Sequence, residues 1–196
     1  MARPRRSDDT RQLLVEEGAA GFLANGYHGT GIKQVLDKVG VPKGSFYNYF
    51  DSKETFGQAV IEYHSDCVQR NLAAAFGSAP DPLTGLRAFF GRLMDEFVES
   101  DYTGGCLIAN LGGELEGSDV LRESLSAAWT RWRDGIAGAL RDAQGRGMIR
   151  DDIDAAELAD LLLHSWEGAV IRMKVDRTLD PLRQCLIRLL DDYFRP

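Results

Sequence analysis

The residues from Lys43 to Lys53 have the types and spacing that suit contact with a polyanion. A lysine ammonium can bond a phosphate or a guanine edge, and the hydroxyl of Ser45 can bond either a base or a phosphate. Gly44 lies between these two side chains and lets the backbone approach a partner closely. We therefore predict contact with double-stranded DNA. The residues assigned to it are Thr30, Lys43, Gly44, Ser45, Tyr47, Tyr49 and Lys53.

Cys106 is the second candidate for chemistry. It follows Gly104 and Gly105 and precedes an apolar run, so we expect it to open a short helix. A helix N-terminus favours a thiolate, which would make this cysteine reactive. The alternative is a small buried hydrophobe, which is the usual role of a cysteine outside a disulfide. From this stretch alone, both interpretations stay open.

Catalytic and cofactor chemistry is not indicated elsewhere. His64 and Cys67 lie three residues apart, but they lack the further ligands that a metal site requires, so no metal is expected. The sequence has no phosphate-binding glycine loop and no Gly-x-Ser-x-Gly nucleophile motif, and Ser45 stands in Gly-Ser-Phe instead. We therefore predict that the protein is not an enzyme and needs no cofactor.

The elements that must position the DNA-contacting residues begin with a helix after Thr30. Apolar residues at positions 32, 35, 36 and 39 fall on one helical face, and Thr30 is expected to be the N-cap. Gly40 suits a left-handed residue in the turn that follows, and Pro42 can open the next helix. Helix, glycine turn and a second short helix predict a helix-turn-helix.

The second short helix has an apolar side and a polar side. Phe46 and Phe50 are four residues apart and are expected to face the core, whereas the lysine and the tyrosines point outward. Asp51 is expected to cap the next helix, with Glu54 as its capping-box partner. The N-terminal end of such a short helix can enter the major groove.

The pattern of the remaining sequence also predicts helices, so we expect an all-α fold. The expected helices span residues 8–25, 52–76, 83–100, a short segment from 106, 119–146, 155–175 and a last helix from 181. The breaker GSAPDP at 77–82 separates two of them, Gly26 ends the first, and Asp154 caps the sixth. Leucine stripes on the last two helices suggest a homodimer through a four-helix bundle.

Composition and charge agree with DNA binding despite a net charge of −7 over 196 residues. Residues 1–53 carry eight Lys and Arg against six Asp and Glu, so the acidity belongs to the rest of the chain. Arg3, Arg5 and Arg6 form a basic arm that could contact DNA or merely aid solubility. Widely spaced cysteines, no apolar run of about 20 residues and no apolar segment behind the basic N-terminus predict a cytoplasmic protein with no membrane contact.

Residues 10–56, with FLANGY, the threonine start and GVPKGSFYNYFDSKETF, resemble the TetR family of transcriptional repressors. The resemblance implies a three-helix DNA-binding head, here residues 1–53. It also implies a helical C-terminal domain, here 54–196, that dimerises and holds a small-molecule inducer. The paired heads would address a palindromic operator. Pro42 stands where the family usually has a hydroxyl residue, so the phosphate contact of that hydroxyl is in doubt.

The segments PKGSFYNYFDSKETFG, GGCLIANL and IRMKVDRTLDPL are similar to the electrophile-responsive, N-ethylmaleimide reductase repressor branch of that family. This similarity implies that Cys106 senses an electrophile or oxidant and that Lys174 assists it. The full set assigned to the sensor or ligand pocket is Cys106, Lys174, Phe90, Met94, Trp129 and Trp166. Two alternatives stay open: the same architecture with a reversible hydrophobic ligand, and a helical interaction protein that does not bind DNA.

Overall fold

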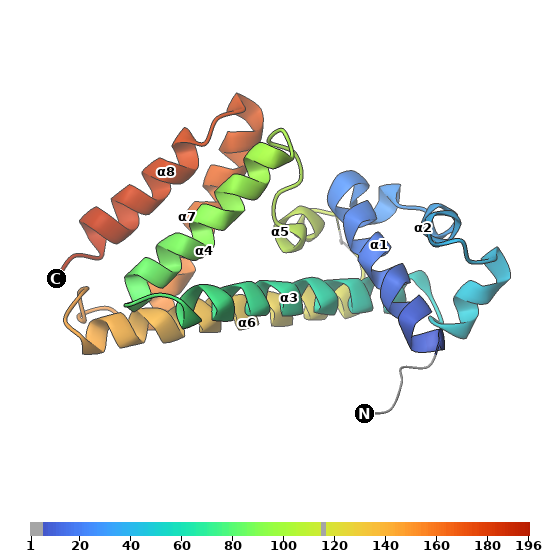
Figure 1. The fold of residues 1–196 in the computed structure, drawn as a ribbon, viewed down its shortest axis with the longest axis horizontal. Helices are drawn as coiled ribbons and strands as arrows, with labels where there is room; N and C mark the ends of the chain where they lie inside the picture. Colours follow the sequence, from blue (N-terminus) through green and yellow to red (C-terminus); the bar gives the residue numbers. More distant parts are fainter. Residues whose placement is uncertain (1–5, 115–116) are drawn as a thin grey trace. The chain divides into compact units, whose positions relative to one another are not determined.

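The computed structural model describes residues 6–114 and 117–196, and side chains from residue 8 onward. The predicted basic arm of Arg3, Arg5 and Arg6 therefore lies outside the residues whose side chains are described. The described chain is helical throughout, with no β-strand in these two ranges (Figure 1). The elements are α1 (Arg6–Gly29), α2 (Ile32–Val39), η1 (Lys43–Asn48), α3 (Lys53–Gly77), α4 (Pro82–Glu99), α5 (Leu107–Gly112), α6 (Asp119–Gly145), α7 (Ala155–Asp176), α8 (Asp180–Leu186) and η2 (Ile187–Tyr193).

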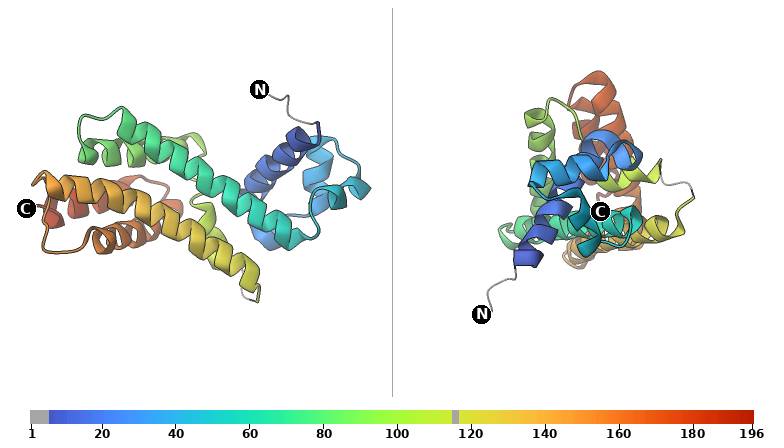
Figure 2. Two further views of the ribbon diagram at one scale, coloured as in Figure 1. Left: turned by 90° about the horizontal axis from the view of Figure 1, so that it is seen from below. Right: turned by 90° about the vertical axis from the view of Figure 1, so that its right-hand side faces the viewer.

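The chain divides into two compact units. Unit 1 comprises residues 1–66 and 107–128, and unit 2 comprises residues 67–106 and 129–196. The chain passes from one unit to the other between residues 66 and 67, 106 and 107, and 128 and 129. The first and third passages fall inside α3 and α6, which Figure 2 shows as unbroken helices. Each unit therefore contains segments that are distant in the sequence.

The core of unit 1 is an aromatic cluster behind the short helix η1. Phe56 of α3 lies at its centre, with ring centroids 5.8 Å from Phe22, 5.7 Å from Phe46 and 5.0 Å from Phe50. Phe46 and Phe50 are 2% and 4% exposed, which confirms that they face the core. Helix η1 is a 3₁₀-helix of six residues, and this cluster fixes its inner side.

The start of unit 1 confirms one predicted helix break and contradicts one predicted cap. Gly26 interrupts α1 as predicted: it adopts φ 73° and ψ 175°, which only glycine tolerates, and a second short helical segment continues from this kink to Gly29. Thr30 does not cap α2, because Gly31 occupies the N-cap position. The Thr30 side chain is 3% exposed and its hydroxyl donates to the Gly26 carbonyl at 2.7 Å. The kink exposes a carbonyl that needs a donor, and Thr30 supplies it.

The predicted Asp51 cap is also displaced by one residue. The side-chain oxygen of Ser52 accepts from the Thr55 backbone N–H at 3.1 Å, and the Thr55 hydroxyl accepts from the Ser52 backbone N–H at 3.0 Å. A serine and a threonine therefore form the reciprocal cap that had been assigned to Asp51 and Glu54. By contrast, Gly40 confirms its predicted turn, with φ 71° and ψ 32° at the end of α2.

Unit 2 has one large apolar core made by the second halves of α3 and α6 together with α4, α7, α8 and η2. Asp154 caps α7 as predicted, its side chain accepting from the Ala156 backbone N–H at 2.8 Å. Helix α8 follows α7 after a reversal at Arg177 and packs against it, as Figure 1 shows. The predicted last helix is correct, but it changes to a π-helix at Ile187. Within the described ranges, no helix combines the length and apolar character needed to cross a bilayer.

Candidate nucleic-acid interface and sensor site

The outer side of η1 presents most of the residues predicted to contact DNA. Lys43 and Gly44 are exposed, Tyr47 is 70% exposed, and Ser45 and Tyr49 are half-buried. A Cβ added at Gly44 would meet nothing within 4 Å, so the packing of the folded chain does not require glycine there. An open backbone at this position leaves room for a partner to approach.

The side chains beneath this surface hold it rigidly. Phe46 contacts the Tyr47 ring edge-on, with centroids 5.5 Å apart, and Arg11 of α1 lies 4.9 Å from the centre of the Phe50 ring. The backbone of η1 is closed by the bond from the Ser45 N–H to the Pro42 carbonyl at 2.8 Å. Pro42 thus begins the turn as its N-cap residue, one position before the first helical residue. A well-packed short helix with an exposed lysine at its N-terminal end suits a groove of DNA.

Two of the residues predicted to contact DNA make contacts within the protein instead. Thr30 is buried against α1, as described above. The Lys53 ammonium donates to the Tyr27 carbonyl at 2.6 Å and lies 4.5 Å from the centre of the Tyr27 ring. Burial lowers the pKa of Lys53, although the charge of Glu114 opposes this change. Lys53 therefore joins α3 to the end of α1, a role that its position in the sequence did not indicate.

The loop that leads to Cys106 lies against Lys174 of α7 within unit 2. Gly104 and Gly105 have φ values of 80° and 103°, and they carry the chain to a half-buried Cys106 just before α5 begins at Leu107. A Cβ at Gly105 would lie 2.6 Å from the Lys174 ammonium nitrogen, so the backbone next to the cysteine contacts the end of that side chain. The loop that carries Cys106 thus lies beside Lys174.

A third residue, Glu167, completes this group and was not found from the sequence. Its side chain is hydrogen-bonded to the Cys106 thiol and interacts with the charge of Lys174. Burial raises the pKa of Glu167 to about 7, and these two neighbours oppose the increase. Glu167 and Lys174 are seven residues apart, which places both on one side of α7. We call Cys106, Glu167 and Lys174 the Cys106 cluster.

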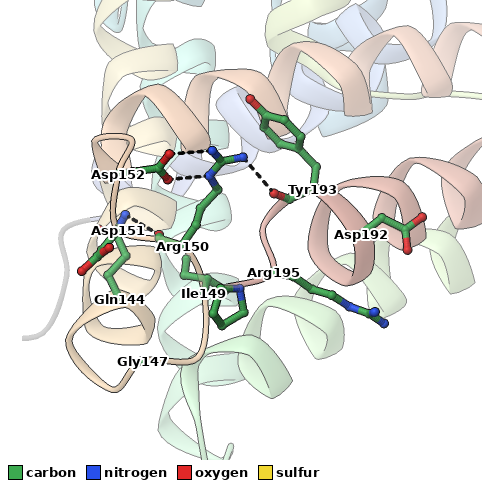
Figure 3. A pocket seen from close by; sticks show the side chains of 10 residues that line it. Gln144, Gly147, Ile149, Arg150, Asp151, Asp152, Asp192, Tyr193 and Arg195 are labelled. Carbon is green, nitrogen blue, oxygen red and sulfur yellow. Dashed lines mark hydrogen bonds and ion pairs between the residues drawn. The ribbon is translucent and has the colours of Figure 1, made fainter.

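The predicted pocket residues belong to an aromatic network in the core of unit 2. Phe90 and Trp166 are almost fully buried, with ring centroids 4.5 Å apart, whereas Met94 and Trp129 are half-buried. Trp129 stacks on His164 at 5.7 Å. None of these four lines the depression of about 710 Å³ near the C-terminus, where Arg150 bonds Asp152 and the Tyr193 carbonyl (Figure 3).

No metal site is found in the described parts of the chain, where no group of three or more His, Cys, Asp or Glu side chains could hold an ion. Burial lowers the pKa of His64 to about 4, so its imidazole is neutral at pH 7. Cys67 lies near Arg70, whose guanidinium nitrogen is 3.0 Å from the sulfur. The pair noted in the sequence thus has contacts of an ordinary structural kind.

Comparison with known proteins gives matches along most of the chain. The model of the bacterial regulatory proteins of the tetR family matches residues 10–60, and that of the tetracyclin repressor-like C-terminal domain matches residues 82–187. The HTH-type transcriptional repressor DhaR of Mycobacterium sp. (strain GP1) is 38% identical over 178 residues, which is 90% of this chain and 88% of that protein.

Two solved structures share the fold. The regulatory protein TetR from Rhodobacter sphaeroides has a TM-score of 0.85 and 34% identity over 93% of this chain and 97% of its own. The reduced form of Escherichia coli NemR has a TM-score of 0.86 and 27% identity over 93% and 96%. These relatives are regulatory proteins and not enzymes, in line with the absence of a catalytic motif from the sequence. The chain belongs to the TetR family of DNA-binding transcriptional regulators.

Proposed function

We propose that the protein represses transcription as a homodimer on a palindromic operator and is released when a small electrophile or oxidant reacts with Cys106. Residues 1–53 bind the DNA, and residues 54–196 hold the sensor and the dimer contacts. The observation that carries the sensor assignment is a half-buried thiol hydrogen-bonded to a buried carboxyl, on a loop that lies against a lysine. Family membership answers the alternative of a helical protein that does not bind DNA.

The DNA contacts are assigned to the exposed edge of η1. Lys43, Gly44 and Tyr47 face outward, whereas Thr30 and Lys53 are engaged within the protein and contribute by holding α1 and α3 in place. Lys43 stands at the N-terminal end of η1, where a side chain reaches either a phosphate or a guanine edge. Ser45 and Tyr49 are half-buried and lie beside this edge.

Lys43→Ala is expected to weaken operator binding by at least about tenfold, since each head loses one charged contact to DNA. The slope of log affinity against log salt should become shallower by about one for each phosphate contact removed. Fluorescence anisotropy with the DNA upstream of the gene at several salt concentrations measures both quantities. Arg146→Ala is the matched control, because Arg146 is an exposed cation paired with Asp142 in unit 2, just after α6. Unchanged affinity in Lys43→Ala would contradict the assignment.

Dimerisation is assigned to the outer face of the α7–α8 pair. Leu161, Ile171 and Val175 are 38%, 65% and 70% exposed, and their spacing places them along one side of α7. Ile187 of η2 is 44% exposed and continues the apolar surface beyond α8. Two such pairs can bury these side chains against each other in a four-helix bundle around a two-fold axis. The symmetric pair then presents two copies of η1 to one duplex.

Release follows from a shift between two conformations. An adduct on Cys106 changes the affinity for DNA only as far as it favours one conformation over the other. Cys106 directly precedes α5, and α5 packs on α1 within unit 1. The Glu114 carboxylate accepts from the His28 backbone N–H, and the His28 ring is 3.1 Å from the Glu114 carbonyl. A displacement of α5 therefore acts on the helix that supports η1.

Cys106→Ser is expected to keep operator affinity within about twofold of wild type and to lose release by electrophiles, because the serine hydroxyl is a far weaker nucleophile than a thiol. The measurement is operator binding before and after treatment with a thiol-alkylating reagent. Cys67→Ser and Cys185→Ser are the controls and should still release. Equal release of wild type and Cys106→Ser would instead favour the reversible hydrophobic ligand, which acts without a reactive thiol.

A further inference from the structure

The Glu167 carboxyl is buried without full use of its hydrogen-bonding capacity. The residue is 8% exposed, and among the described residues its Oε1 atom has no hydrogen-bond partner. Burying a carboxyl in this way is unfavourable, and an unsatisfied group of this kind in a folded protein needs a reason. An apolar side chain of similar length would stabilise the core better. The carboxyl therefore calls for a role beyond packing.

The surroundings of Glu167 place it against one reactive group. Its carboxyl is bonded to the Cys106 thiol from the loop before α5, and Lys174 of α7 is the charged group that acts on it. Gly105, with no side chain and φ 103°, allows the loop to lie against Lys174 and Val170. The carboxyl of Glu167 thus interacts with both the thiol and the ammonium, and Cys106 is half-buried rather than fully enclosed.

We propose that Glu167 is the general base of the sensor, accepting the thiol proton of Cys106 as the sulfur attacks a small carbon electrophile. This inference rests on the proposed function of Cys106 and adds the residue that activates it. Glu167 touches the reacting thiol, so it acts directly and not through another side chain.

The step balances within the cluster. The Cys106 S–H bond breaks and its proton goes to the Glu167 carboxylate, while the sulfur forms a bond to carbon. With an alkyl halide such as iodoacetamide, the carbon–iodine bond breaks and the electron pair leaves with iodide. The proton then passes from Glu167 to water. Before this step the cluster holds a thiol, a carboxylate and an ammonium; during attack it holds a thiolate, a carboxylic acid and an ammonium. Its net charge does not change.

This internal transfer explains why the carboxyl is buried beside a lysine. Release of the thiol proton to solvent would leave a thiolate and a carboxylate together in a poorly solvated site, which is unfavourable. Transfer to Glu167 avoids this second negative charge, and Lys174 stabilises whichever of the two partners is negative. Burial raises the pKa of Glu167 to about 7, nearer to that of an ordinary thiol, which makes the transfer less uphill.

The test is the rate at which iodoacetamide alkylates each cysteine of the full-length protein, followed by peptide mass spectrometry between pH 5.5 and 9.5. Glu167→Gln keeps the size of the side chain and a hydrogen-bond acceptor but cannot take a proton. We expect it to slow alkylation of Cys106 at pH 7.5 by at least about tenfold. Cys67 and Cys185 of the same molecule are internal controls, and their rates should stay within about twofold of wild type.

The pH profile separates a general base from a structural role. In wild type the Cys106 rate should rise through about pH 7, as Glu167 ionises. In Glu167→Gln the rise should move toward about pH 8.5, where an ordinary thiol ionises. The wild-type profile needs no variant, so it remains decisive if Glu167→Gln folds poorly. A wild-type rate that rises only near pH 8.5, or equal rates in both proteins, would overturn the inference.

Operator binding in the same samples distinguishes this inference from the proposed function. Suppose that alkylation of Cys106 releases DNA but Glu167→Gln reacts as fast as wild type. The sensing role of Cys106 is then supported, and the role of Glu167 as general base is contradicted. Suppose instead that Glu167→Gln reacts slowly but the alkylated wild-type protein still binds DNA. The role of Glu167 as general base is then supported, and the proposed sensing function of Cys106 is contradicted.

Discussion

Phe56→Ala is expected to lower the free energy of unfolding by about 3–5 kcal/mol, the usual cost of removing a buried phenylalanine ring. The ring is 1% exposed and contacts the rings of Phe22, Phe46 and Phe50. Gly18 of α1 has no side chain, and a Cβ placed there would lie 2.3 Å from the Phe56 ring. Helices α1 and α3 therefore pack closely around this ring. Operator binding should fall with stability, since Phe46 anchors η1 on the same cluster.

Urea unfolding followed by circular dichroism at a fixed protein concentration measures this change. Leu13→Ala is the control: Leu13 lies on α1 in the same unit but is 51% exposed, so its removal should cost less than about 0.5 kcal/mol. A Phe56→Ala protein within about 1 kcal/mol of wild type and with normal operator affinity would show that the aromatic cluster does not support the DNA-binding surface.

Glu167→Gln is expected to change the pH dependence of stability by about 3 kcal/mol. Burial raises the folded-state pKa of Glu167 from 4.5 to about 7, and each pKa unit corresponds to about 1.4 kcal/mol. Because the folded-state pKa is the higher one, the folded state binds the proton more tightly than the unfolded state. The stabilisation from protonated Glu167 is complete below about pH 4.5 and is lost as the pH rises to about 7.

The glutamine side chain cannot ionise, so the variant does not lose stability in this way as the pH rises. Relative to wild type, its free energy of unfolding should therefore increase by about 3 kcal/mol between pH 4 and pH 8.5. Urea unfolding of both proteins across this range, again at one protein concentration, gives the difference directly. A constant difference between the two proteins would mean that Glu167 ionises as readily in the folded chain as in the unfolded one. Together with the alkylation result, the variant would gain stability relative to wild type as the pH rises, and its Cys106 would react more slowly.

Much of the fold could be predicted because it follows from local patterns. Apolar residues at helical spacing located every α-helix to within a few residues, and the breaker at 77–82 separates α3 from α4 as expected. Asp154 and Gly40 each have one local role, as a cap and as a left-handed turn, and the structure confirms both. The outward direction of Lys43 and Tyr47 followed from the inward direction of Phe46, since these three residues share η1.

Other features depended on competition between neighbours that a local pattern does not resolve. Thr30 could cap α2 or bond the carbonyl freed by the kink at Gly26, and it does the second. The cap of α3 could start from Asp51 or Ser52, and the reciprocal pair with Thr55 favours Ser52. Lys53 looked like a cation for phosphate, but Tyr27 lies beside it in the fold. In each case a contact from another segment or the next residue decided the outcome.

Glu167 was missed because its significance is tertiary. Its position between Leu163 and Val170 lies on the buried stripe of α7, so an acidic residue there was a signal that could have been noticed. That signal alone would not have named a partner, since Cys106 lies about sixty residues earlier in the sequence. Only the double-glycine loop, folded back onto α7, brings the two together.

The chain passes three times between the two compact units, and this limits which segments can be exchanged between related proteins. The first 66 residues do not form unit 1 alone, because α5 and the start of α6 complete it. Leu111 and Leu121 are both fully buried there, and the Leu121 side chain lies 2.9 Å from the Cβ position of Gly57. A chimera that exchanged only the N-terminal third of the gene would place foreign side chains against these leucines. Grafting a new operator specificity onto this scaffold therefore requires residues 107–128 to be transferred or rematched together with the head.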